Sequence, residues 1–428
     1  MIRIDFTQLA EVNTPTPNPS PQGGGGPDYR SVVPTLHGLM PSRAAAKSPS
    51  PLRGGVRGGG TSLPHCLVGK DTRFFRLTLA LISILLTFTT QSFAANTTVQ
   101  AAIDGFVRPA YARFATATKT QRSAIDQLCA SPSEAPLEAA RTAFRQGVIA
   151  WSEVETIRFG PVTEQNHLER ILFWPDRKSI GLKQVQAALV DEDKTATDPK
   201  TLAGKSVAMQ GFGSLEFVLF GTGSDELTSN AGAYRCRFGA AIAANLQTIA
   251  ADVSNAWTNP NGFAAQWANP GPDNALFRTD QEALSELVDI LVQGLEMIRD
   301  VRLNGFLGHW PEEDKPKQAI YWRSQATVPS LAANVDGLRK LFEASQIGKS
   351  LKTGDGHIAQ SIGIVLGNSV KAAADLGDPA PTEALKDKAQ RDQLDHFRLT
   401  TSTLSELIGV RLTGALGLSA GFSSLDGD

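Results

Sequence analysis

From residue 95 onward, apolar side chains recur every three or four positions, and this spacing limits the folds open to the chain. One face of an α-helix repeats with this period, whereas a half-buried strand alternates every second residue. Such stretches cover about 99–114, 134–157, 279–302, 328–345, 357–376 and 382–410. The clearest stretch carries Phe238, Ile242, Leu246, Ile249, Val253 and Trp257. Because no alternation bounded by turn residues occurs there, the sequence predicts an all-α fold.

Helix-breaking residues gather in two long segments, 259–278 and 303–318. Thr279 and Glu282 follow the first segment with the spacing of a capping box, which starts a helix. Amphipathic helices of this length with long interruptions are typical of packed helical bundles. We therefore predict two packed bundles joined by long loops, each half of the chain resembling a four-helix bundle: an N-terminal bundle over 95–258 and a C-terminal bundle over 279–428.

The first 70 residues contain 10 Pro and 11 Gly and show no helical or strand periodicity. Such a segment buries too little surface to offset its ordering entropy. We expect 1–67 to be either disordered low-complexity sequence or an extension that precedes the true translation start near Val68.

Residues 68–94 have the three parts of a secretory signal peptide. Lys70, Arg73 and Arg76 precede an apolar run over 77–88, and Ser92-Phe93-Ala94 supplies a small-residue cleavage site. The alternative is a membrane anchor, but a run of this length is too short to cross about 30 Å of hydrocarbon as a helix. The sequence predicts export to the periplasm, with no transmembrane segment in the mature chain.

Charge and cysteine content narrow the class of protein further. The whole chain has 41 Lys and Arg against 43 Asp and Glu, and the mature part is more acidic, so nucleic acid is not an expected partner. Cys129 and Cys236 are the cysteines after the signal peptide. An even pair in an oxidising compartment predicts a disulfide.

Glu216 is the most informative single residue. It lies in the almost wholly apolar stretch 206–221, which predicts a core helix. A carboxylate in such a place must be paired, metal-bound or protonated. Two interpretations stay open: an ion pair with Arg158 or Arg170, or a contact with a ligand or metal. Asp176 and Glu153 are further candidates, since Trp174-Pro175-Asp176 is a potential pocket wall and Glu153 a potential carboxylate for a cleft between the bundles.

Five segments resemble the imelysin-like proteins of the bacterial cell envelope. The motif Gly-x-His-x-x-Glu of that family aligns with 211–216, GFGSLE. The segments WSEVETIRFGP at 151–161, ERILFWPD at 169–176, YRCRF at 234–238 and GFSSLDGD at 421–428 also fit. The resemblance implies paired helical bundles with a site between them. It also implies a link to iron acquisition, with iron or another divalent metal as cofactor and iron-uptake components of the envelope as partners.

The family motif is incomplete here, because Gly213 stands where the family has histidine. A histidine and a glutamate three positions apart share a helix face and hold one cation together, and glycine supplies no ligand. His309-Trp310-Pro311-Glu312 is a loop candidate rather than a metal site, since proline interrupts it. The sequence favours a non-enzymatic periplasmic binding protein. The alternatives are a metal-dependent hydrolase with unrecognised ligands and an envelope interaction scaffold.

Overall fold

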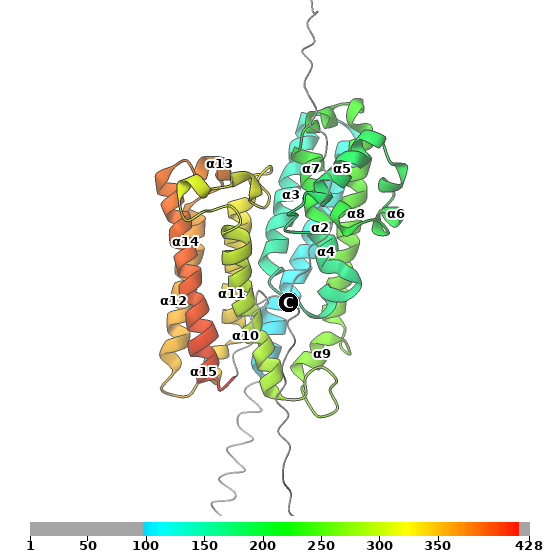
Figure 1. Ribbon diagram of the computed structural model, residues 1–428. Coiled ribbons are helices and arrows are strands. Elements are labelled where there is room, and N and C mark those ends of the chain that lie inside the picture. Colours follow the sequence, from blue (N-terminus) through cyan, green and yellow to red (C-terminus); the bar gives the residue numbers. More distant parts are fainter. Residues whose placement is uncertain (1–96, 419–428) are drawn as a thin grey trace, which may run out of the picture. The chain divides into compact units, whose positions relative to one another are not determined.

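The computed structural model describes residues 97–418, and within this range every regular element is a helix (Figure 1). The longer helices are α2 (Arg108–Ala130), α3 (Glu134–Val154), α5 (Ile180–Asp191), α7 (Gly211–Phe220), α8 (Ala233–Thr258), α10 (Asp280–Glu296), α11 (Thr327–Ser345), α12 (Gly356–Asp375) and α14 (Lys388–Glu406). Shorter ones are α4 (His167–Ile171), α6 (Pro199–Ala203), α9 (Phe263–Ala268), α13 (Pro381–Ala384) and α15 (Thr413–Ala415). The predicted all-α fold is confirmed. Segments 1–67 and 68–94 and the C-terminal motif 421–428 lie outside the described residues.

The helices pack as two neighbouring groups (Figure 1). In the first group α2 packs against α3 and α8, and α7 packs against α8. In the second, α12 packs against α11 and α14, and α10 packs against α14. Helix α11 also packs along α3, so it joins the two groups.

Three stretches adopt π-helix geometry: η1 (Ile103–Val107), η7 (Met297–Leu303) and η11 (Leu407–Leu412). Segments of this kind are frequent at functional sites because the extra residue re-aims side chains. Helix η7 continues α10 and ends where the interrupted segment 304–326 begins. It therefore directs the last turn of that helix toward the site described below.

The predicted core helix over 206–221 is shorter in the structure. A 3-10 turn (η4, Val207–Met209) precedes it, Gln210 is extended, and α7 starts at Gly211. Gly211 has a φ of +79°, and a Cβ there would lie 2.2 Å from the carbonyl oxygen of Ile171. Only glycine fits this bend, and this local backbone requirement overrides the apolar continuity of the segment.

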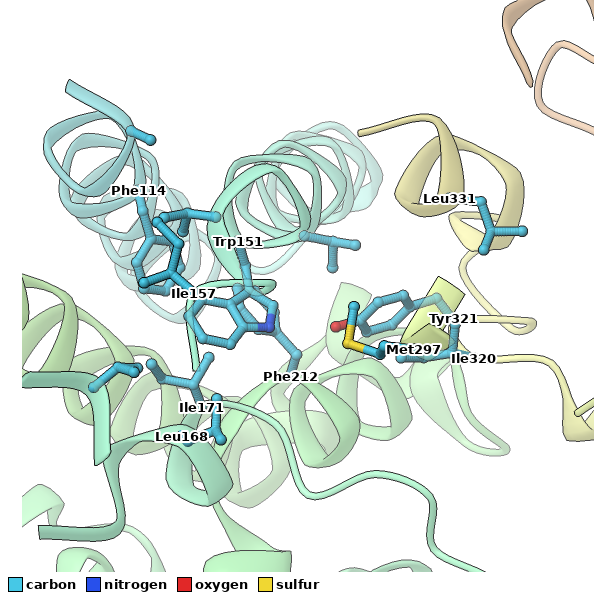
Figure 2. Packing of buried hydrophobic residues seen from close by; sticks show 14 of the residues in the cluster. Phe114, Trp151, Ile157, Leu168, Ile171, Phe212, Met297, Ile320, Tyr321 and Leu331 are labelled. Carbon is cyan, nitrogen blue, oxygen red and sulfur yellow. The ribbon is translucent and has the colours of Figure 1, made fainter. Parts of the chain in front are cut away.

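An aromatic cluster anchors the interrupted segment 304–326 to the first group of helices. The Phe212 ring of α7 lies 5.9 Å from Phe144 and 6.4 Å from Tyr321, between ring centroids. Figure 2 shows Trp151 and Phe212 beside Tyr321, which belongs to that segment. Each buried aromatic side chain contributes a few kcal/mol of apolar burial. The segment is therefore held in place although it contains little regular structure.

Two local predictions are confirmed. Cys129 in the last turn of α2 and Cys236 in the first turn of α8 form a disulfide, with their Cα atoms 5.5 Å apart. Thr279 caps α10, since its hydroxyl accepts the Glu282 N–H at 3.2 Å. No described helix is long and apolar enough to cross a membrane. The proposed division into bundles at 259–278 stays a prediction.

Candidate functional site

A cavity of about 1140 Å³ opens beside α7, and we call it the outer cavity. Its wall comes from the connection between α4 and α5, from the end of η7, from segment 304–323, from Glu216 of α7 and from Arg398 of α14. The second predicted interruption, 303–318, supplies much of this wall. Long connections in compact domains often carry functional residues, because their side chains are not all required for packing the core.

Glu216 lies at the buried end of the outer cavity and is only 5% exposed. Its Oε1 accepts the backbone N–H of Ser324 at 2.9 Å and the Ser324 hydroxyl at 2.8 Å. Burial raises the pKa of the Glu216 carboxyl, while the bonds from Ser324 and the charge of Arg323 oppose that rise. The buried carboxylate is therefore satisfied by the segment that closes the cavity.

Neither arginine proposed as the partner of Glu216 contacts it. Arg170 donates to Gln210 Oε1 at 3.0 Å and to Asn245 Oδ1 at 2.6 Å. Arg158 has an exposed side chain and lies beside a different cavity. The ion-pair interpretation was wrong because Ser324, more than 100 positions away, supplies the donors. Helical periodicity gives no information about such a distant loop contact.

Asp176 lines the outer cavity, but its carboxylate caps α5. It accepts the N–H groups of Ile180 at 2.7 Å, Gly181 at 2.9 Å and Leu182 at 3.2 Å. These bonds satisfy amides that have no partner within the helix. The carboxylate thus positions the wall of the cavity.

Glu153 lies outside the outer cavity and joins three helices. Its carboxylate accepts from Arg113 of α2 at 3.1 and 2.9 Å and from Lys340 of α11 at 2.6 Å. The structure thus brings Glu216 and Asp176 to one cavity, and places Glu153, Arg158 and Arg170 elsewhere.

The acidic and basic side chains that line the outer cavity differ in how they are paired. Besides Glu216 and Asp176, its carboxylates are Asp300, which accepts from Arg299 and Asn304, and Glu313, which accepts the His309 N–H at 3.1 Å. Every lining carboxylate is therefore already hydrogen-bonded. By contrast, four lining cations have no carboxylate within 4 Å among the described residues: Arg177, Lys315, Lys317 and Arg323.

Trp322 gives this cationic wall an aromatic surface. The Arg323 guanidinium lies 4.5 Å from the centroid of its ring, and the Lys317 ammonium lies 5.9 Å away. Tyr321 beside it is buried, its hydroxyl has no hydrogen-bond partner, and burial raises its pKa well above the usual value. Cations held against an aromatic face and facing an open cavity suit an anionic ligand with planar groups.

The residues present do not fit a bare metal ion at the incomplete motif. Gly213 is exposed, and a Cβ there would meet no atom within 4 Å, so no neighbour replaces the missing imidazole. Glu216 Oε1 is occupied by Ser324. Within residues 97–418, no three His, Cys, Asp or Glu side chains lie close enough together to hold a metal ion.

Comparison with known proteins identifies the family to which the chain belongs. The family model described as imelysin matches residues 107–406. The chain belongs to the imelysin family. It is 23% identical over 261 residues to iron-regulated protein A of Synechococcus elongatus, an alignment covering 60% of this chain and 67% of that protein.

Two solved structures share the imelysin fold. An imelysin-like protein of Psychrobacter arcticum superposes with a TM-score of 0.64 at 19% identity, covering 77% of this chain and 98% of the other. A protein described as an iron-regulated protein A precursor of Parabacteroides distasonis gives 0.63 at 14% identity, covering 76% and 95%. At these identities the likeness shows the fold alone.

Sequence reasoning missed most of the cavity wall. Asp300, Tyr321, Trp322, Arg323 and Arg398 all line the cavity. The one usable signal was the long interruption 303–318, whose basic residues precede a Tyr-Trp-Arg run. Nothing in the periodic pattern of α14 marks Arg398.

Proposed function

We propose that this imelysin-family chain is an exported, non-enzymatic binding protein of the periplasm with a role linked to iron, and that it binds an anionic iron chelate in the outer cavity. The iron link comes from its relatives, two of which are named as iron-regulated proteins. Export comes from the signal-peptide pattern of 68–94.

One observation carries the proposed ligand class: the carboxylates of the outer cavity are bonded, whereas four of its cations are not. This cationic wall belongs to a chain with a slight excess of acidic residues, so the local field opposes the overall charge. A bare cation would meet repulsion and occupied carboxylates there. An iron complex with a polycarboxylate carries negative charge and planar oxygen groups, and guanidinium groups bind these well.

Calorimetric titration of the full chain with ferric citrate, citrate and zinc sulfate tests the proposal. We expect saturable binding of ferric citrate and weak binding of zinc. Lys317→Gln combined with Arg323→Gln should weaken ferric citrate binding by about a hundredfold, because each lost contact with a charged group costs about tenfold.

The matched control removes two cations outside the cavity. Lys119 and Arg237 are exposed and have no carboxylate within 4 Å among the described residues. The double variant Lys119→Gln, Arg237→Gln should bind ferric citrate like the unmodified chain. Equal weakening by both double variants would show that only net charge matters and would contradict a built site.

The two alternatives give different results. Zinc-dependent peptide hydrolysis that a chelator abolishes and Glu216→Gln removes would establish the hydrolase interpretation. If none of the three probes binds, the binding-protein proposal is contradicted and the interpretation as an envelope interaction scaffold is favoured. Sequencing the N-terminus of the secreted protein tests export, and we expect it to begin at Ala95.

A further inference from the structure

A second, smaller cavity of about 150 Å³ lies behind Trp174, and we call it the inner cavity. It is lined by the end of α3 and the residue Arg158, by α4 and the chain after it up to Pro175, and by Arg302 of η7. Trp174 and Pro175 line both cavities, so one wall separates them. No residue of the family motif lines the inner cavity.

A buried ion pair between Arg302 and Glu155 lines the inner cavity, and part of the arginine side chain has no hydrogen-bond partner. Arg302 is 5% exposed, and its Nη2 donates to both oxygens of Glu155 at 3.0 and 2.9 Å. Glu155 Oε1 also accepts from Asn334 at 2.8 Å. The Nε and Nη1 groups of Arg302 are buried without any partner. Leaving guanidinium N–H groups unpaired in the interior is costly, so such groups call for an acceptor.

Two indole N–H groups on the wall of the inner cavity are also buried without a hydrogen-bond partner. Trp151 is 1% exposed, and its Nε1 has no partner; Trp174 Nε1 is also buried without one. Figure 2 shows the indole nitrogen of Trp151 on the side of its ring that faces the hydroxyl of Tyr321, another buried group without a partner. Every buried side-chain atom that lacks a partner on the wall of the inner cavity is thus an N–H donor. Glu169 also lines the cavity, but it is exposed and interacts electrostatically with Arg158.

Because the buried unpartnered groups are donors, they favour a bound molecule that accepts hydrogen bonds. A water molecule accepts two hydrogen bonds but must also donate two, and the buried unpartnered groups on this wall offer it no acceptor. A carboxylate only accepts, has about four lone-pair sites, and matches the planar edge of a guanidinium. The volume is large enough for several water molecules or for one small carboxylate.

We propose that the inner cavity is a carboxylate-binding site in which Arg302, Trp151 and Trp174 donate to the carboxylate oxygens and Arg158 attracts it from the exposed side. The carboxylate comes either from a free small acid or from one arm of a larger molecule that also fills the outer cavity. The site does not depend on the proposed iron role, because no group in it needs a metal.

Selective ¹⁵N labelling of the indole groups in the full chain tests the site directly. The chain has six Trp residues, so six indole N–H resonances are expected. Titration with sodium acetate, against sodium chloride at equal ionic strength, should shift the resonances of Trp151 and Trp174 along one saturation curve. Trp257 is the matched control, because its indole is also fully buried but lies outside both cavities.

A second probe separates the two sources of the carboxylate. If tricarballylate shifts Trp322 of the outer cavity together with Trp151 and Trp174, the carboxylate is an arm of a larger ligand. If acetate binds and leaves Trp322 unmoved, the site takes a free acid. Trp174→Phe should weaken either probe about tenfold, the loss expected for one hydrogen bond to a charged group.

The proposal is overturned if neither probe produces a saturable shift beyond that of chloride, which would mean that water alone fills the cavity. It is also overturned if Trp257 shifts with the same curve as Trp151 and Trp174. The wild-type titration decides both points even if Trp174→Phe does not fold.

Discussion

Glu216→Gln tests whether this buried carboxylate is structural. Burial raises the pKa of the Glu216 carboxyl. As the pH rises above the ordinary pKa of 4.5, the unfolded chain releases its proton first, so the free energy of unfolding falls until the pH exceeds the folded-state pKa. At pH values above the folded-state pKa, each unit by which burial raises the pKa lowers the free energy of unfolding by about 1.36 kcal/mol. Glutamine carries no proton to release, so the variant should lack this loss.

The magnitude follows from the two bonds that Ser324 donates. A bond to a charged group contributes about 1.5–3 kcal/mol and a neutral one about 0.5–1.5 kcal/mol, so the glutamine loses about 2 kcal/mol of bonding in total. It recovers a desolvation penalty of several kcal/mol for the buried ion. We therefore expect Glu216→Gln to be about 1–2 kcal/mol more stable than the unmodified chain at neutral pH.

Urea unfolding of both proteins between about pH 5 and about pH 9 measures the effect through the linkage between stability and proton binding. Glu216→Leu is the control, because it leaves the buried Ser324 N–H without an acceptor and should cost about 1–3 kcal/mol relative to the glutamine variant. The reasoning fails if Glu216→Gln is clearly less stable than the unmodified chain above pH 7. It also fails if the pH dependence is unchanged.

Further expectations concern the disulfide, the motif glycine and a second perturbed carboxyl. Denatured, unreduced protein lacking residues 1–94 should show no reactive thiol, because Cys129 and Cys236 are bonded; two thiols per chain would contradict this. Gly213→His should stabilise α7 by about 0.5 kcal/mol in thermal unfolding, since its side chain enters open space, and should raise zinc affinity only modestly. Burial raises the pKa of Glu286 to about 7, so stability should fall between about pH 4.5 and 7 by about 1–2 kcal/mol after allowing for partial exposure. Urea titration of Glu286→Gln should lack that fall.

Helix positions were predictable because packing enforces them locally. The run from Phe238 to Trp257 falls within α8, and the cap at Thr279 starts α10, because both signals act within a few residues of the chain. The end of the predicted helix at 206 was wrong because Gly211 requires a positive φ against Ile171, a tertiary contact that periodicity does not contain.

The site was less predictable because its interactions span long distances in the sequence. The apolar surroundings of Glu216 correctly indicated a buried carboxylate, yet its donors come from Ser324, 108 positions away. Glu153 and Glu155 lie two positions apart but have different partners: Glu155 pairs with buried Arg302, and Glu153 with partly exposed cations. Only the fold reveals which neighbour each carboxylate meets.

Equilibrium dialysis of the full chain against ferric citrate, with iron and citrate counted separately in the protein compartment, tests the central claim most directly. If the outer cavity binds an anionic chelate, iron and citrate should be retained together and lost together in the Lys317→Gln, Arg323→Gln double variant. Iron retained without citrate, and unaffected by that double variant, would contradict the account.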